Sequence, residues 1–201
     1  MKHTILILAA FVVFISSCKK EVDPVVPHAE SKKVTNLYAP ADVRDQTTGE
    51  ITQTNPFVYF SFAKGTAVDS LDSWDIAFKG TVIITNSGIS GTGQAKSTIV
   101  NSTFDDLTEA PADSELKEDS ATAYAIPWGS GNGWYNYDPT SHLISPIAGR
   151  IIVVKTNDGK YAKMEILNYY KDAPAQPDPT VDQGSTLTFN FVYQDNGTNK
   201  F

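Results

Sequence analysis

Hydrophobic residues in this chain fall mainly in short runs rich in β-branched and aromatic residues, a pattern that predicts strands. The clearest example is "RIIVVKTNDGKYAKMEILNYY" at residues 150–170, where two such runs flank Asn-Asp-Gly at residues 157–159. An Asp-Gly pair supplies the positive φ angles that a tight hairpin turn needs. We therefore expect a β-hairpin, with Ala162, Met164 and Ile166 on one face of its second strand.

Other segments have the same character, and all are bounded by glycine, proline or polar residues. They are residues 56–63, 73–78, 81–85 and 185–194. Lys79 and Gly80 form a two-residue gap between two of them, which is a hairpin signal. Only residues 104–119 have helical character, and Pro111 limits that helix to short pieces. The pattern predicts an all-β fold, a single mainly antiparallel domain over residues 34–201 with at most one or two short helices.

Burial of the hairpin at residues 150–170 is expected to dominate the stability of the domain. Ile151, Val153, Ile166 and Leu167 would each contribute roughly 1.5–3 kcal/mol if fully buried.

The first residues follow a different pattern. Lys2 precedes the apolar run "ILILAAFVVFI" at residues 5–15, and Ser16 and Ser17 follow it. This order is typical of a secretory signal peptide, and the run is shorter than the roughly 20 residues of a membrane-spanning helix. A small-residue pair before the single cysteine, Cys18, is similar to a lipobox, in which the thiol is acylated and the chain is cut just before it. The alternative is an ordinary signal peptide that is cut a few residues later.

On the lipoprotein interpretation, residues 1–17 are the signal peptide and residues 18–33 are a flexible tether between lipid and domain. The tether is charged, contains proline and lacks periodicity, and we expect its His28 to be solvated. Several acyl chains anchor a protein stably where one would be marginal. The "KKEVDP" that follows Cys18 is similar to the export tag of lipoproteins on the outer face of Gram-negative outer membranes. We therefore expect a lipid-anchored protein on the extracellular face of the outer membrane.

Charge and motifs narrow the function. A net charge of −7 and a pI near 4.9 argue against nucleic acid as a partner, because phosphates require clustered Lys and Arg. No nucleophile elbow, His-Glu-x-x-His sequence or Walker loop is present, so we expect no enzyme activity. Asp72 and Asp75 flank Trp74 and could form a glycosidase-like pair. The simpler interpretation is that they are a surface charge and a turn contact.

Candidate ligand chemistry is concentrated at residues 133–149, "GWYNYDPTSHLISPIAG". Trp134, Tyr135, Tyr137 and His142 could enclose a flat aromatic ligand, with the rings covering its faces and the imidazole binding iron. The alternative is that the aromatic residues close one end of the β core and that His142 is hydrogen-bonded at its rim.

Met164 is the only other soft donor after the tether, since a thioether can also ligate haem iron. Its place on the predicted strand face with Ala162 and Ile166 equally suits a core residue.

The segments "SWDIAF", "TNSGISGTG", "TNDGKYAKMEILNYYKD" and "FNFVYQ", in this order, resemble the HmuY family over about residues 34–194. The resemblance implies an all-β, lipid-anchored or secreted haem-binding protein. Such proteins capture haem and pass it to a TonB-dependent outer-membrane receptor.

In the family pattern, two histidines on facing loops, or methionines in other members, hold the iron. After the tether this chain has one histidine, His142, and one methionine, Met164. The resemblance therefore implies His142 as an axial ligand, Met164 as a weaker second candidate, and Trp134, Tyr135 and Tyr137 as the pocket. A tyrosine could also be the second ligand. An alternative function is a lipid-anchored interaction module that presents a different ligand or a glycan to an outer-membrane receptor.

Overall fold

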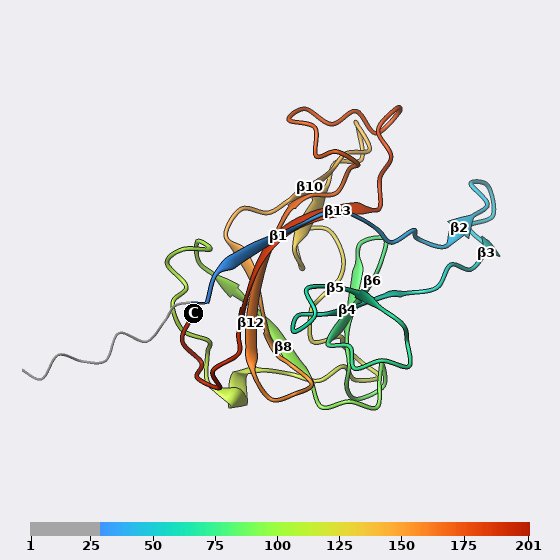
Figure 1. The fold of residues 1–201 in the computed structure, drawn as a ribbon. Coiled ribbons are helices and arrows are strands. Elements are labelled where there is room, and N and C mark those ends of the chain that lie inside the picture. Colours follow the sequence, from blue (N-terminus) through green and yellow to red (C-terminus); the bar gives the residue numbers. More distant parts are fainter. Residues whose placement is uncertain (1–28) are drawn as a thin grey trace, which may run out of the picture.

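The computed structural model describes residues 29–201, and nearly all of its regular structure is β-strand (Figure 1). The strands are Ser31–Tyr38 (β1), Val43–Arg44 (β2), Ile51–Gln53 (β3), Val58–Ser61 (β4), Thr66–Val68 (β5), Ile76–Lys79 (β6), Val82–Thr85 (β7), Lys96–Asn101 (β8), Tyr135–Tyr137 (β9), Ile144–Pro146 (β10), Arg150–Lys155 (β11), Tyr161–Asn168 (β12) and Thr186–Gln194 (β13). A five-stranded sheet has the order β1-β13-β12-β11-β8, and a four-stranded sheet has the order β5-β4-β6-β7. Strands β2–β3 and β9–β10 form two further two-stranded ribbons. Every pairing is antiparallel, which confirms the predicted fold class.

The main core lies between the two larger sheets. Phe60 and Phe78, from β4 and β6, each contact Phe189 of β13, with ring centroids 5.4 and 5.7 Å apart. Ile152 and Met164 of β11 and β12 belong to the same buried cluster. The apolar faces predicted on separate segments are therefore buried against one another.

The five-stranded sheet is covered on its other face as well. Ile151 and Val153 of β11 point into a second cluster with Leu116 and Phe201, which come from irregular segments after β8 and β13. A strand that is buried on both faces has no polar face to alternate with, which explains the continuous apolar run in β11.

The β11–β12 hairpin forms as predicted. Lys155 pairs with Tyr161, and Gly159 has a φ of 78° in the connecting turn. Leu167 is an exception to the expected burial, because 37% of its surface is exposed. It lies at a β-bulge between Ile166 and Asn168, where the register against β13 shifts and the strict alternation of faces is lost.

The stretch at residues 104–119 contains one turn of 3₁₀-helix, Asp113–Glu115, in agreement with the short helical pieces expected there. This turn is the sole helix within residues 29–201. Strand β1 begins at Ser31, inside the segment expected to be a tether, because residues 31–33 pair with β13. Cys18 and His28 lie outside the described residues. Within residues 29–201, no helix has the length and hydrophobicity needed to cross a membrane.

Candidate functional site

The aromatic stretch that starts at Trp134 is divided between the interior and the surface. Trp134 is 2% exposed, and its indole nitrogen donates a 3.0 Å hydrogen bond to the carbonyl oxygen of Thr81. Tyr135 is also buried, and its hydroxyl lies 3.3 Å from the Thr81 hydroxyl. Both side chains therefore fasten the β9–β10 ribbon to the β6–β7 turn. Their burial in the main core agrees with the alternative interpretation, in which these two residues close one end of the β core.

Tyr137 and His142 lie on the surface and contact each other. Tyr137 is 40% exposed, and its hydroxyl oxygen lies 2.6 Å from Nδ1 of His142. His142 is exposed and has a φ of 60°, a left-handed conformation that histidine adopts more readily than most residues with a Cβ. The structure thus brings together one of the three predicted aromatic residues and the predicted imidazole.

The turn that carries His142 is held by Asp138. The Asp138 carboxylate accepts hydrogen bonds from the backbone N–H of Thr140 and the hydroxyl of Ser141, each at 2.8 Å. These bonds, that of Thr140 first, lower the pKa of Asp138. The lowered pKa favours the charged carboxylate, which holds the turn at residues 138–141 through these two hydrogen bonds.

A second loop projects from the same end of the molecule. Residues 171–185, which connect β12 to β13, lie beside the β9–β10 ribbon at the top of Figure 1. The ribbon is tied to the base of this loop by the backbone N–H of Ile144, which donates to the Tyr170 hydroxyl at 3.0 Å. The loop contains no histidine, methionine, tyrosine or cysteine. Of the two neighbouring loops, only the one with His142 carries a strong iron ligand.

Met164 is fully buried in the main core, opposite Ile152 in the β11–β12 pairing. A thioether enclosed by apolar side chains between two sheets does not reach a ligand at the surface. The alternative interpretation of Met164 as a core residue is the arrangement found in the structure.

The carboxylates of Asp72 and Asp75 have separate structural roles. Asp75 is buried, and its two oxygens accept 2.8 Å hydrogen bonds from the backbone N–H groups of Phe62 and Asn157. Burial raises the pKa of Asp75. Asp72 is at the surface in an ion pair with Lys64. Asp75 is thus a bridge between two chain segments, whereas Asp72 belongs to a surface ion pair.

A separate open groove of about 490 Å³ lies over the four-stranded sheet, within the 300–1,000 Å³ range typical of ligand sites. We call it the aromatic groove. Its apolar lining is Phe57, Val82, Ile89, Ala121, Ala123, Tyr124 and Trp128, and its polar lining is Arg44, Lys79, Ser120 and Thr122. Trp128 and Ile89 are 63% and 60% exposed. The groove therefore combines unusually exposed apolar side chains with two cations and no acidic lining residue.

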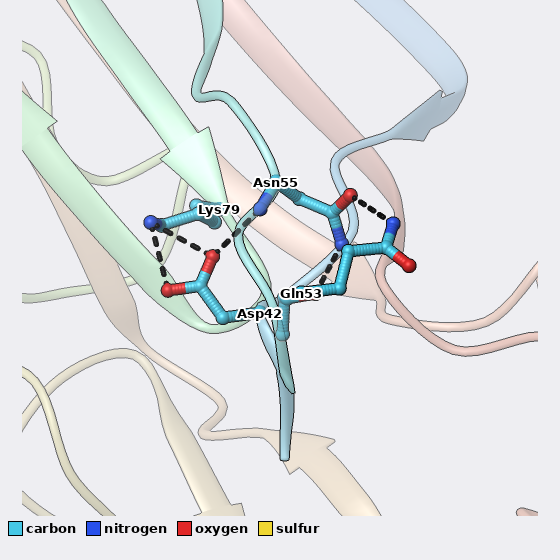
Figure 2. Close-up of polar contacts among 5 residues, drawn as sticks. Asp42, Gln53, Asn55 and Lys79 are labelled. Carbon is cyan, nitrogen blue, oxygen red and sulfur yellow. Dashed lines mark hydrogen bonds and ion pairs between the residues drawn. The ribbon is translucent and has the colours of Figure 1, made fainter. Parts of the chain in front are cut away.

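Lys79 is fixed in this groove by the contacts shown in Figure 2. Its Nζ lies 3.1 Å from both carboxylate oxygens of Asp42. The same atom lies 4.7 Å from the centre of the Phe57 ring. Asp42 also accepts a 2.9 Å hydrogen bond from the backbone N–H of Asn55. That bond and Lys79, in this order, lower the pKa of Asp42. Gln53 at the end of β3 donates to the Asn55 side chain, so the network joins the β2–β3 ribbon to β6.

The aromatic groove was not predicted from the sequence. Its side chains come from distant segments, from Arg44 to Trp128, and are brought together only by the sheet. One local signal existed: in "WGSGNGW" at residues 128–134, two tryptophans are separated by a glycine-rich turn, and only Trp134 enters the core.

The described side chains do not form a site for a bare metal ion. Within the described part of the chain, no group of three or more His, Cys, Asp and Glu side chains is placed to hold a bare metal ion. A ligand that brings its own metal, and needs only one side chain from the protein, is not subject to that requirement.

Comparison with known proteins gives the following matches. Residues 53–182 match the HmuY protein family. Similar solved structures include a Bacteroides vulgatus protein described as an HmuY-like heme-binding protein, with 14% identity, TM-score 0.47, and coverage of 83% of this chain and 92% of that chain. An apo HmuY analogue of Tannerella forsythia has 16% identity, TM-score 0.44, and coverage of 84% and 96%. A Bacteroides fragilis protein described as a lipoprotein has 13% identity, TM-score 0.46, and coverage of 68% and 82%. No curated protein matches the chain.

Proposed function

The chain belongs to the HmuY family, and we propose that it is a lipoprotein of the outer membrane that binds haem or a related porphyrin without turning it over. The observation that carries the proposal is the exposed imidazole of His142, which is held in one orientation by the Tyr137 hydroxyl. Cys18 is the proposed site of the lipid anchor. A TonB-dependent receptor is the proposed recipient of the haem, as the family resemblance implies.

The contact with Tyr137 suits His142 to act as an axial ligand. If Nδ1 carries the proton and donates it to the Tyr137 oxygen, Nε2 keeps a lone pair for iron. Histidines that bind metals usually donate their second N–H to a neighbouring acceptor in this way, which fixes the tautomer and the ring orientation. Tyr137 is then a positioning residue, and the aromatic face beside His142 belongs to Tyr137 alone.

The residues present fit a haem held from one side. Met164 is buried, and the loop at residues 171–185 has no imidazole, thioether or phenol. Haem supplies the iron and the flat apolar ring, while this chain supplies one nitrogen ligand. We therefore expect the ferric complex to have a high-spin spectrum, in contrast to the low-spin spectrum of a site with two strong axial ligands.

The test is a titration of the purified protein with haemin, followed by visible spectroscopy. A saturable Soret band that is lost in His142→Ala supports the proposal. His28→Ala is the matched control, because it removes a histidine of the expected tether and should leave the band unchanged. A wild-type protein that leaves the haemin spectrum unchanged would refute haem binding. A low-spin spectrum would contradict the single-ligand site.

Experiments with the receptor separate haem binding from the alternative function as an interaction module. If haem is not bound, a module that presents another ligand should still co-purify with a β-barrel receptor, and His142→Ala should co-purify equally well. If haem transfer is the function, the receptor should remove haem from the wild-type protein, as measured by loss of its Soret band.

A further inference from the structure

We propose that the aromatic groove is a second binding site, separate from His142, for a small amphipathic organic anion. The expected ligand has a flat apolar body and one carboxylate or sulfonate group. His142 does not line this groove, and neither does Tyr137.

The walls of the aromatic groove favour a ligand with an apolar body. Trp128 and Ile89 leave large apolar surfaces in water, and Phe57 and Tyr124, which line the same groove, are half-buried. Such exposed apolar surface usually marks a site of interaction. Aromatic side chains bind flat rings well, because they bury a large area and stack at favourable angles. A flat apolar molecule would therefore cover the surface that is now exposed to water.

The charges of the aromatic groove favour a ligand with one anionic group. Arg44 and Lys79 line the groove, and the carboxylate of Asp42 behind them neutralises one of the two. Arg44 donates one hydrogen bond from Nη1 to the carbonyl of Gly49, and a guanidinium has five N–H donors. The groove thus keeps about one net positive charge on a chain whose total charge is −7. An anion is complementary to this local charge, whereas a cation would meet no acidic lining residue.

Iron coordination is not the chemistry of this groove. Its lining contains no histidine, methionine or cysteine, and Tyr124 is its only residue with an iron-binding atom of any strength. The ion pair of Lys79 with Asp42 and its position over Phe57 instead fix a charge beside an aromatic wall. This arrangement recognises an organic anion by stacking and by a charge-assisted hydrogen bond.

The experiment uses two fluorescent probes that share an N-phenylnaphthylamine body. One is 8-anilino-1-naphthalenesulfonate, which carries one sulfonate, and the other is N-phenyl-1-naphthylamine, which is neutral. We expect saturable binding of the anionic probe to the folded wild-type protein. Trp128→Ala should weaken the binding of both probes about tenfold, because both lose their stacking contact. Arg44→Gln should weaken the binding of the anionic probe alone, again about tenfold, and Arg44→Lys should restore part of the lost affinity.

Leu71→Ala is the matched control, because Leu71 is a highly exposed apolar residue that does not line the aromatic groove. It should bind both probes as the wild type does. The proposal is overturned if the wild type shows no saturable binding of the anionic probe. It is also overturned if Trp128→Ala binds both probes normally, or if Arg44→Gln weakens the two probes equally. A change from dimer to monomer in Trp128→Ala, seen by sedimentation, would identify a second copy of the chain as the occupant and would also overturn it.

Failure of this proposal is distinguishable from failure of haem binding. Trp128→Ala should bind haemin as the wild type does, and His142→Ala should bind the anionic probe as the wild type does. If Trp128→Ala loses haemin binding while His142→Ala keeps it, the groove is the haem site and both proposals are wrong.

Discussion

Two groups of aromatic side chains in this protein arise in opposite ways. Trp134, Tyr135, Tyr137 and His142 are neighbours in the sequence, but the fold places the first two in the core and the last two on the surface. The aromatic groove is assembled from side chains that are far apart in the sequence, including Phe57 and Trp128. The contiguous group leaves only Tyr137 and His142 exposed, whereas the assembled group lines an open groove.

The comparison shows that aromatic residues clustered along the chain do not by themselves mark a binding surface. In a strand, every second side chain points to the same face, so Tyr135 and Tyr137 share one face of β9 and would be equally buried only if that face were uniformly covered. The β9–β10 ribbon is covered by the β6–β7 turn at Tyr135 and leaves the body at Tyr137. Burial along one ribbon face therefore depends on what lies over each position.

The largest expected effect is the difference in stability between substitution of the buried Trp134 and of the exposed Trp128. Trp134→Ala should lower the free energy of unfolding by about 3–5 kcal/mol, because it leaves a cavity in the core and an unpaired carbonyl at Thr81. Trp128→Ala should change it by no more than about 0.5 kcal/mol, because Trp128 is largely exposed. Urea denaturation measures both values. Equal effects would show that the division into core and surface is wrong.

The next effect concerns Met164, which the sequence left open as an iron ligand or a core residue. Met164→Ala should cost about 2–5 kcal/mol of stability, and Met164→Leu less than about 1.5 kcal/mol, since leucine fills a similar volume. Urea denaturation gives both values, and the haemin spectrum of Met164→Leu should equal that of the wild type. A shifted Soret band in this variant with unchanged stability would identify Met164 as an iron ligand and contradict its role in the core.

A smaller effect is expected where the two aromatic groups meet, in the glycine-rich turn between Trp128 and Trp134. A Cβ at Gly133 would lie 2.1 Å from the carbonyl oxygen of Pro127, so Gly133→Ala must displace the backbone next to Trp128. We expect a loss of about 1–3 kcal/mol and weaker binding of the anionic probe. Asn132→Ala, at an exposed position in the same turn, is the control. Normal probe binding by Gly133→Ala would show that the groove does not depend on this turn.

The smallest effect tests the same lesson on Asp72 and Asp75, which are also close in sequence and different in burial. The pKa of Asp75 is raised above the ordinary value of 3.8, so the folded protein binds this proton more tightly than the unfolded chain. Stability relative to Asp75→Asn should therefore fall as the pH rises from about 3.8 to the raised pKa, and should then stay constant. Denaturation at a series of pH values checks this sign. The exposed Asp72→Asn should change stability by no more than about 0.5 kcal/mol.

Much of the fold was accessible from the sequence. The hairpin around Gly159, the β6–β7 hairpin and strand β13 all lie where turn residues and β-branched runs predicted them. Strands β1 and β8 were missed, because edge strands such as "SKKVTNLY" are polar and are defined by the neighbour they pair with. The short helical pieces expected at residues 104–119 amount to one 3₁₀ turn, Asp113–Glu115, and the same segment packs Leu116 onto the second face of the five-stranded sheet.

The sequence alone determined the class of fold, the family and the identity of the one imidazole that follows the expected tether, because these depend on local patterns and on residue types. Only the tertiary structure decided that Met164 and Trp134 are interior, that His142 is exposed beside Tyr137, and that Phe57, Lys79 and Trp128 share one groove. The reason is physical: burial and proximity are properties of pairs of segments, and the packing of the two sheets sets them.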